Sequence, residues 1–197
     1  MFTIMAATTN NHKINEIRPL FENRPVSLKS LAEFKDFPEI IEGGSSFEEN
    51  AAIKARAVFE HFNMPVFADD SGLAVPALDN APGIYSARYA GPEADYQKNN
   101  LLLLENMKLF KNEERLARFI CTVCYKDSNN ELFFTGIAEG RIIDSFRGEG
   151  GFGYDPLFFY PELNKTFAEL SMEEKNKYSH RGKAVRKFIE YLDKFVL

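Results

Sequence analysis

Pro65-Val66-Phe67-Ala68-Asp69-Asp70-Ser71-Gly72 is an apolar run that ends in two adjacent carboxylates and a Ser-Gly pair. The run from 65 to 68 predicts a buried β-strand, and the Ser-Gly pair predicts a turn directly after the two acids. Two adjacent carboxylates are costly to bury unless a cation or hydrogen bonds compensate them. The stretch therefore predicts a strand that delivers Asp69 and Asp70 to a site of function.

Helices and strands are predicted to alternate on both sides of this stretch. Strands are expected at Phe2–Ala7, Val26–Leu31, Ala117–Lys126 and Glu131–Ile143, and the last two form a hairpin. Helices are expected at Asn11–Phe21, from a Ser46 cap to Asn63, at Asp95–Phe110, from a Ser171 cap to Ser179, and from Ala184 to the C-terminus. This order predicts an α/β fold with a mixed sheet, in a single domain over residues 1–197.

Acidic and anion-binding residues gather in a few segments. Glu42 lies just before a helix start, and two glycines follow it. Groups that bind anions are concentrated in Thr8-Thr9-Asn10-Asn11-His12-Lys13, Gly150-Gly151-Phe152-Gly153-Tyr154-Asp155 and Ser179-His180-Arg181-Gly182-Lys183. Taken singly, a capped helix start explains the first segment, and a solvated loop carboxylate explains Glu42. Carboxylates for a hard metal, combined with cations and backbone amides for phosphate, indicate metal-assisted phosphoryl chemistry on a nucleotide.

Composition narrows the class of protein. The chain has 197 residues, is 45% hydrophobic and carries a net charge of −5, which fits one domain with a real core and argues against broad nucleic-acid binding. The N-terminus lacks a basic start, and no apolar run reaches the roughly 18 residues of a membrane span. We therefore expect a cytoplasmic protein with neither a nucleic-acid nor a membrane partner.

Two motifs match known sequence patterns but do not indicate the functions that go with those patterns. Cys121 and Cys124 form a Cys-x-x-Cys, but residues i and i+3 of a strand point to opposite faces, so two buried free thiols are expected. Gly148 to Gly153 matches the dinucleotide fingerprint in spacing. That fingerprint must open a helix, whereas the following segment Asp155–Tyr160 predicts a strand.

Six motifs, in their order along the chain, resemble the Ham1 family of inosine and xanthosine triphosphate pyrophosphatases. They are Thr8-Thr9-Asn10-x-x-Lys13, Ser46-Phe47-x-Glu49-Asn50-Ala51-x-x-Lys54-Ala55, Ala68-Asp69-Asp70-Ser71-Gly72-Leu73, Pro82-Gly83-Ile84-Tyr85-Ser86-Ala87-Arg88-Tyr89, Gly150-Gly151-Phe152-Gly153-Tyr154-Asp155-Pro156 and Ser179-His180-Arg181-Gly182. The resemblance implies an elongated, two-lobed mixed-sheet fold with a central cleft, and a homodimer that uses Mg²⁺. The implied reaction is hydrolysis of non-canonical purine nucleotides (ITP, dITP, XTP and dXTP) to the monophosphate and pyrophosphate, which cleanses the nucleotide pool.

The resemblance also implies a role for each matching residue. Glu42 and Asp70 would bind Mg²⁺ with Asp69 as a further candidate ligand, and Asp70 would be the proton acceptor. The substrate would be bound by Thr8, Thr9, Asn10, Asn11, His12, Lys13, Ser71, Phe152, Gly153, Tyr154, Asp155, Lys175, His180 and Arg181. Within this set, Phe152 would stack on the base and Asp155 would make a polar contact with it. A donor from Lys175, His180 or Arg181 would favour the C6 carbonyl of inosine over the amine of adenine.

Two alternatives stay open. One is the same metal chemistry on dUTP or a modified pyrimidine triphosphate, although a pyrimidine would leave the pocket of residues 152–155 underfilled. The other is a non-catalytic nucleotide-binding protein. Loss of Glu42, Asp69 or Asp70 would have favoured this alternative, but all three are present. His12 stands where many members of the family have Gly, and Pro76 stands where an acid is frequent.

Overall fold

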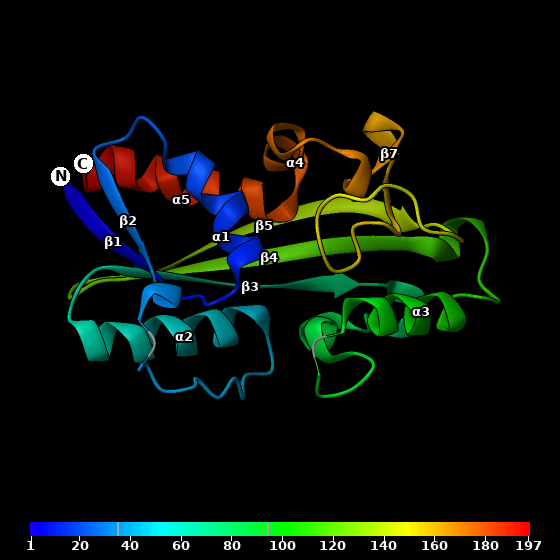
Figure 1. Ribbon diagram of the computed structural model, residues 1–197, viewed down its shortest axis with the longest axis horizontal. Helices are drawn as coiled ribbons and strands as arrows, with labels where there is room; N and C mark the ends of the chain where they lie inside the picture. The colour runs from blue at the N-terminus through cyan, green and yellow to red at the C-terminus, as the bar shows by residue number, and fades with distance from the viewer. Residues whose placement is uncertain (35, 94) are drawn as a thin grey trace. The chain divides into compact units, whose positions relative to one another are not determined.

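The computed structural model describes residues 1–34, 36–93 and 95–197. Seven strands form a sheet in the order β2-β1-β3-β4-β5-β6-β7 (Figure 1). Their bounds are Phe2–Ala6 (β1), Val26–Ser30 (β2), Val66–Ala74 (β3), Leu116–Lys126 (β4), Glu131–Ile142 (β5), Phe158–Tyr160 (β6) and Lys165–Thr166 (β7). β1 pairs in parallel with β2 and β3, whereas β6 pairs antiparallel with β5 and β7. The mixed α/β sheet expected from the sequence is confirmed.

Five α-helices accompany these strands in the described part of the chain. They are Asn11–Ile17 (α1), Phe47–Phe62 (α2), Tyr96–Asn106 (α3), Met172–Tyr178 (α4) and His180–Phe195 (α5). Short 3₁₀ turns occupy Arg18–Phe21, Leu31–Glu33, Pro76–Leu78, Gly83–Arg88, Asn112–Arg115, Pro161–Leu163 and Phe167–Glu169. Each predicted helix is present, and the first one tightens into a 3₁₀ turn where Pro19 removes a backbone donor.

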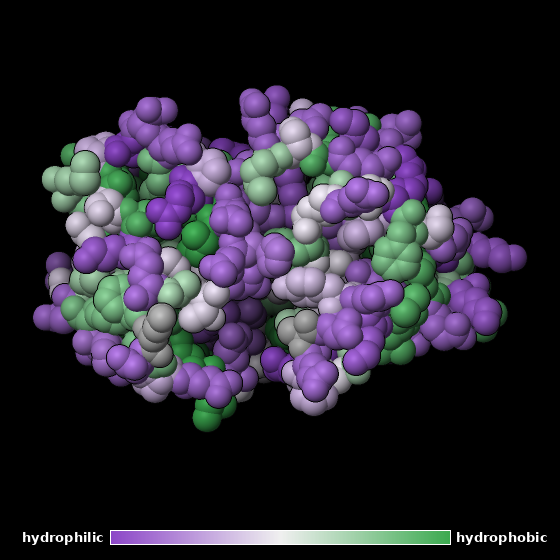
Figure 2. All heavy atoms as spheres, in the orientation of Figure 1, coloured by the Kyte–Doolittle hydropathy of each residue, from purple (hydrophilic) through white to green (hydrophobic). Residues whose placement is uncertain are grey.

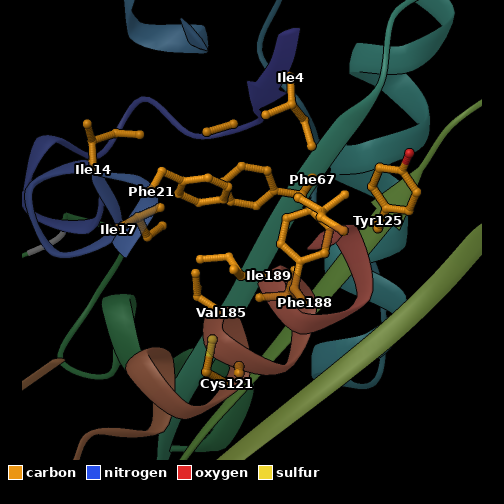
Figure 3. Packing of buried hydrophobic residues seen from close by; sticks show 14 residues of the cluster. Ile4, Ile14, Ile17, Phe21, Phe67, Cys121, Tyr125, Val185, Phe188 and Ile189 are labelled. Atoms are coloured by element: carbon orange, nitrogen blue, oxygen red, sulfur yellow. The ribbon is translucent and has the colours of Figure 1, made fainter. Parts of the chain in front are cut away.

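The chain divides into two compact units. Unit 1 comprises Met1–Asp70, Cys121–Gly136 and Arg181–Leu197, and unit 2 comprises Ser71–Ile120 and Ile137–His180. In unit 1, α1 and α5 cover one face of the strands and α2 covers the other (Figure 1). Figure 3 shows the first of these cores, where Phe67 and Phe188 pack with ring centroids 5.2 Å apart.

Unit 2 has its own core. Fully buried Phe158 and Phe167 form its aromatic centre, with ring centroids 4.8 Å apart. Gly140 on β5 shows how tightly strand β6 approaches, because a Cβ there would lie 2.5 Å from the Phe159 carbonyl oxygen. A close strand contact therefore explains why glycine stands at this position.

Several boundaries differ from those expected, α3 ending at Asn106 rather than at Phe110, and three of the differences bear on the predicted site. β3 runs without a turn through Asp69-Asp70-Ser71-Gly72, because pairing continues past the acids. The strand expected at Asp155–Tyr160 begins only at Phe158, after a turn in which the Leu157 and Phe158 amides both donate to the Tyr154 carbonyl. α5 begins at His180 rather than at Ala184, so His180 and Arg181 lie in its first turn.

Among the described residues, no helix is both long and apolar enough to cross a membrane. Hydrophilic residues cover most of the face drawn in Figure 2, and hydrophobic residues gather there in smaller groups.

Candidate active site

Strand β3 sends its two carboxylates in opposite directions. Successive side chains of a strand alternate between the faces of the sheet. Phe67 belongs to the core under α1 and α5, whereas Val66 and Ala68 belong to the core under α2. By this alternation, Asp69 lies on the face of α1 and α5, and Asp70 lies on the face of α2.

Asp70 meets a lysine, an amide and a second carboxylate. Lys54 Nζ lies 3.2 Å from Asp70 Oδ1 and 3.2 Å from Glu42 Oε2. Asn50 donates from Nδ2 to Asp70 Oδ2 over 3.3 Å. Asn50 and Lys54 are one helical turn apart on α2, so both side chains leave the same face of that helix. Two carboxylates from distant parts of the chain thus converge on one cation.

Burial and charge oppose each other at this cluster. Burial raises the pKa of Asp70 above its ordinary value, although the positive charges of Lys54 and Lys13 counteract the shift. Burial favours neutral Lys54, but the charges of Asp70 and Glu42 outweigh it, and the net shift raises the pKa of Lys54. Lys54 therefore stays a cation, and Asp70 is the more readily protonated of the two adjacent aspartates.

Asp69 is almost completely buried, at 2% exposure, and it binds two cations through one oxygen. Its Oδ2 lies 3.0 Å from Lys13 Nζ and accepts a hydrogen bond from Arg181 Nε over 3.1 Å. Lys13 Nζ also donates to the Asp69 carbonyl over 3.3 Å. Arg181 in turn donates from Nη1 to Glu16 Oε2 over 2.5 Å. The order of contacts is Lys13–Asp69–Arg181–Glu16, with alternating charge.

This buried chain of charges fixes the ionisation of its members. Burial would raise the pKa of Asp69, but the charges of Lys13 and Arg181 more than offset it and hold that pKa well below the usual range. The carboxylates of Glu16 and Asp69 raise the pKa of Arg181 against the effect of burial. Asp69 is therefore ionised throughout the physiological pH range.

The predicted phosphate segment forms the junction between β1 and α1. Asn10 is the N-cap of α1, and its Oδ1 accepts hydrogen bonds from the amides of His12 and Lys13 at 2.9 and 3.4 Å. The Asn10 amide donates to Thr8 Oγ1 over 3.1 Å. Thr9, Asn11 and His12 are exposed, so this side of the segment is open to a ligand. The structure brings Lys13 to Asp69 and leaves the rest of the segment at the surface.

The other predicted substrate-binding residues form a cluster in unit 2. Buried Asp155 accepts from the Phe152 amide over 2.8 Å and forms a short ion pair with Lys175. Lys175 Nζ lies 5.0 Å from the centre of the Phe152 ring. Gly151 has φ +70°, and a Cβ there would lie 2.0 Å from Asp155 Oδ2, so this turn requires glycine. A ring, a cation and a carboxylate are held side by side.

Further contacts fix this cluster in unit 2. Asn100 donates from Nδ2 to the Gly153 carbonyl over 2.8 Å, and the Tyr154 hydroxyl donates to the Ser86 carbonyl over 2.9 Å.

Two further predicted substrate-binding residues, His180 and Ser71, lie elsewhere in unit 2. The His180 ring stacks on Phe119 with centroids 4.5 Å apart and planes 8° apart. Ser71 follows Asp70 on β3 and is half-buried.

The donor set around Asp70 fits a magnesium ion. Among the residues that the structure describes, no three His, Cys, Asp or Glu side chains form a metal cage by themselves. Mg²⁺ needs no such cage, because it commonly takes one or two carboxylates and completes its shell with water and substrate phosphates. Glu42 and Asp70 already share one cationic group, the ammonium of Lys54. Their oxygens are thus arranged to neutralise a cation.

Three residues of this site are not among the site residues that were predicted from the sequence. Asn50 and Lys54 belong to a quoted motif, and their i, i+4 spacing before the two aspartates is the signal that would have found them. Glu16 lies one helical turn after Lys13 and is 3% exposed. A glutamate among the apolar positions Ile14 and Ile17 is a weaker signal, since its partner Arg181 is 165 residues away.

The two cysteines are free and buried, as expected. Cys121 belongs to the core under α1 and α5, and Cys124 to the core under α2. Burial raises the pKa of Cys124 to about 12, and it raises the pKa of Cys121 as well. Both thiols are packing groups in their protonated form.

Known proteins are similar to this chain over nearly its whole length. The chain is 46% identical over 193 residues to a dITP/XTP pyrophosphatase of Geobacter sulfurreducens, covering 98% of this chain and 97% of that one. It is 49% identical over 185 residues to a dITP/XTP pyrophosphatase of an Exiguobacterium species, covering 93% of each. The solved HAM1 protein of Coxiella burnetii matches with a TM-score of 0.90 and 38% identity, over 98% of this chain and 100% of that one. The model of the Ham1 family matches residues 4–191, and the chain belongs to that family.

Proposed function

We propose that this chain is a nucleoside-triphosphate diphosphatase that hydrolyses non-canonical purine nucleotides, with dITP and XTP as substrates. One observation carries the proposal: Glu42 and Asp70 converge on a single cationic group, Lys54 Nζ, at 3.2 Å each. That arrangement suits a magnesium ion with a polyphosphate. The relatives named dITP/XTP pyrophosphatase, at 46% and 49% identity over nearly their whole length, support the choice of reaction and of base.

The residues of unit 1 supply the phosphate chemistry. Glu42 and Asp70 would hold Mg²⁺, which when bound neutralises phosphate charge and acidifies a bound water. Lys13 and Lys54 provide further positive charge toward phosphate oxygens. The Asp70 carboxylate would orient the attacking water and accept its proton, the role that the family resemblance implies for this residue. Attack at the α-phosphorus releases pyrophosphate and leaves the monophosphate.

The residues of unit 2 suit the base. A purine stacks on the Phe152 ring, and Lys175 beside it offers a donor to a C6 carbonyl. Adenine presents an amine at that position, which would face the donor without accepting from it. Asp155 orients Lys175 through their ion pair. This arrangement favours a 6-oxo purine over adenine.

The test is release of pyrophosphate by the purified protein from dITP, XTP, ITP, GTP, ATP and dUTP, with Mg²⁺ and with EDTA. We expect release that requires Mg²⁺ and is strongest on dITP, XTP and ITP. Release from dUTP alone would replace the purine assignment with a pyrimidine one. Binding without release from any nucleotide would contradict the enzymatic proposal.

We further propose that the chain forms a homodimer, as the family resemblance implies. Light scattering after size-exclusion chromatography should give twice the chain mass of 22.5 kDa. A mass equal to that of one chain across micromolar concentrations would contradict this part of the proposal.

A further inference from the structure

The contacts of Asp69 and Asp70 differ in kind, although the two residues are adjacent. Asp70 faces the α2 side, where Glu42 and Lys54 lie. Asp69 faces the α1 and α5 side, and its Oδ2 contacts Lys13 and Arg181. Alternation along a strand directs the two carboxylates to opposite faces, and Asp69 Oδ2 already has Lys13 and Arg181 as partners.

Two positive and two negative charges meet in the contacts around Asp69. Lys13 and Arg181 contribute two positive charges, and Asp69 and Glu16 contribute two negative ones. Arg181 has a second carboxylate in Glu16, whereas the contacts of Lys13 Nζ are the side chain and the carbonyl of Asp69. Loss of the Asp69 charge would therefore act most strongly on Lys13, because it leaves two cations near each other without their shared anion.

Lysine needs such an anchor more than arginine does. Its ammonium is a point charge at the end of a flexible four-carbon stem, and fixing that stem costs conformational entropy. Two contacts to one residue of a central strand, at 3.0 and 3.3 Å, fix the position of Nζ before a substrate arrives. The structure thus shows Lys13 held in place while neighbouring Asn11 and His12 remain exposed.

We propose that Asp69 is a positioning residue, whose buried carboxylate holds Lys13 and Arg181 in place and takes no part in binding the metal. The inference deepens the proposed function and rests on it for its substrate. The competing assignment is that Asp69 Oδ1, a buried oxygen without a hydrogen-bond partner in the described residues, is a metal ligand. The two assignments differ in what loss of the Asp69 charge does to metal affinity.

The experiment measures two quantities on the full-length protein. Mn²⁺ affinity is obtained without nucleotide by electron paramagnetic resonance, and KM and kcat for dITP are obtained with Mg²⁺. For Asp69→Asn we expect a KM raised by about tenfold or more, and an Mn²⁺ Kd within about twofold of the wild type. Asp70→Asn should weaken Mn²⁺ by about tenfold or more in the same titration. Asp69→Asn weakening Mn²⁺ as much as Asp70→Asn does would overturn the proposal.

A double-mutant cycle tests whether Asp69 acts through Lys13. Lys13→Met should raise KM on its own without changing Mn²⁺ affinity, and Lys13→Arg should restore part of the loss. In the Lys13→Met background, Asp69→Asn should raise KM by less than about threefold, because its partner is already gone. Fully additive effects of the two substitutions would contradict the coupling.

Two controls separate this result from misfolding and from a wrong reaction. Val123→Ala lies in the same buried core and lowers stability without removing a charge, so it should leave KM unchanged. If Asp69→Asn does not fold, the Lys13 variants test the proposal in its place. An unchanged KM in Lys13→Met then overturns the proposal. A wild type that releases no pyrophosphate from dITP would refute the proposed function, while the Mn²⁺ titrations would still decide the assignment of Asp69.

Discussion

Asp69 and Asp70 show how one strand gives two identical side chains different chemistry. The pKa of Asp69 is held low by Lys13 and Arg181 even though burial opposes ionisation. The pKa of Asp70 is raised, because burial outweighs its nearby cations. A permanently ionised carboxylate such as that of Asp69 suits the anchoring of cations. The difference follows from the direction each side chain takes out of β3.

The first prediction at this scale concerns Asp70→Asn. The amide keeps the shape of the side chain but removes its charge, so nucleotide binding should survive while turnover of dITP falls by about 10²–10⁴-fold. Single-turnover kinetics and nucleotide titration measure the two effects separately. Asp193→Asn, the same substitution at an exposed residue that pairs with Arg24, is the matched control. Near-normal turnover in Asp70→Asn would remove this residue from the chemistry.

Gly151→Ala is a prediction about the unit 2 cluster. A methyl group would lie 2.0 Å from Asp155 Oδ2, at a backbone φ of +70° that other residues rarely adopt. The carboxylate must move, and Lys175 loses its orienting partner. We expect KM for dITP to rise by about tenfold or more, with Mn²⁺ affinity unchanged because Glu42 and Asp70 are not touched. Unchanged KM would show that the Asp155–Lys175 pair does not orient the base.

At the scale of elements, local sequence is a good guide where a local interaction ends a helix or strand. Ser171 caps α4 as predicted and forms a capping box with Glu174, and Asp127–Asn130 closes the predicted β4–β5 hairpin. Ser46 caps α2 as predicted, and Glu49 accepts a hydrogen bond from the Ser45 amide. Such features depend on residues three or four apart, which the sequence shows directly.

The misplaced boundaries depend on distant partners. The Ser71-Gly72 pair is typical of a turn, yet β3 continues because a neighbouring strand pairs with it. The contacts Lys13–Asp69 and Arg181–Glu16 join residues 56 and 165 positions apart. No local pattern encodes them, so the sequence supplies the candidate residues but not their pairing. Period-two alternation along β3 would have separated Asp69 from Asp70, once the strand was known to continue.

The prediction at the scale of elements concerns the β4–β5 hairpin. Asp127 accepts hydrogen bonds from the amides of Asn129 and Asn130 and from the Tyr125 hydroxyl, at 2.7, 2.7 and 2.8 Å. Burial would raise the pKa of Asp127, but these hydrogen bonds lower it on balance. The stabilisation is therefore present above the ordinary carboxyl pKa and is lost as pH falls through the lowered folded value.

Asp127→Asn should test this pH dependence. Its free energy of unfolding should be lower than that of the wild type by about 1 kcal/mol at pH 7, and the difference should shrink below about pH 4. Urea unfolding followed by circular dichroism at pH 7, 4 and 3 measures it. A difference that stays constant over this range would show that the charge of Asp127 contributes nothing.

At the scale of the whole molecule, the chain builds two compact units and returns repeatedly to each. It passes from one unit to the other after Asp70, Ile120, Gly136 and His180. The first three crossings lie within β3, β4 and β5, and the last lies in the first turn of α5. None of these crossings is a separate linker. The single domain predicted for residues 1–197 stays a prediction.

This connectivity predicts one cooperative unfolding transition. Phe188 in unit 1 and Phe158 in unit 2 are both fully buried, so replacing either by Ala should cost about 3–5 kcal/mol. Because a strand that frays in one unit is the same strand that pairs in the other, each substitution should shift a single transition for the whole chain. Hydrogen exchange would then accelerate in both units for either variant. Two separate transitions, or faster exchange confined to the substituted unit, would show that the units unfold independently in spite of sharing β3, β4 and β5.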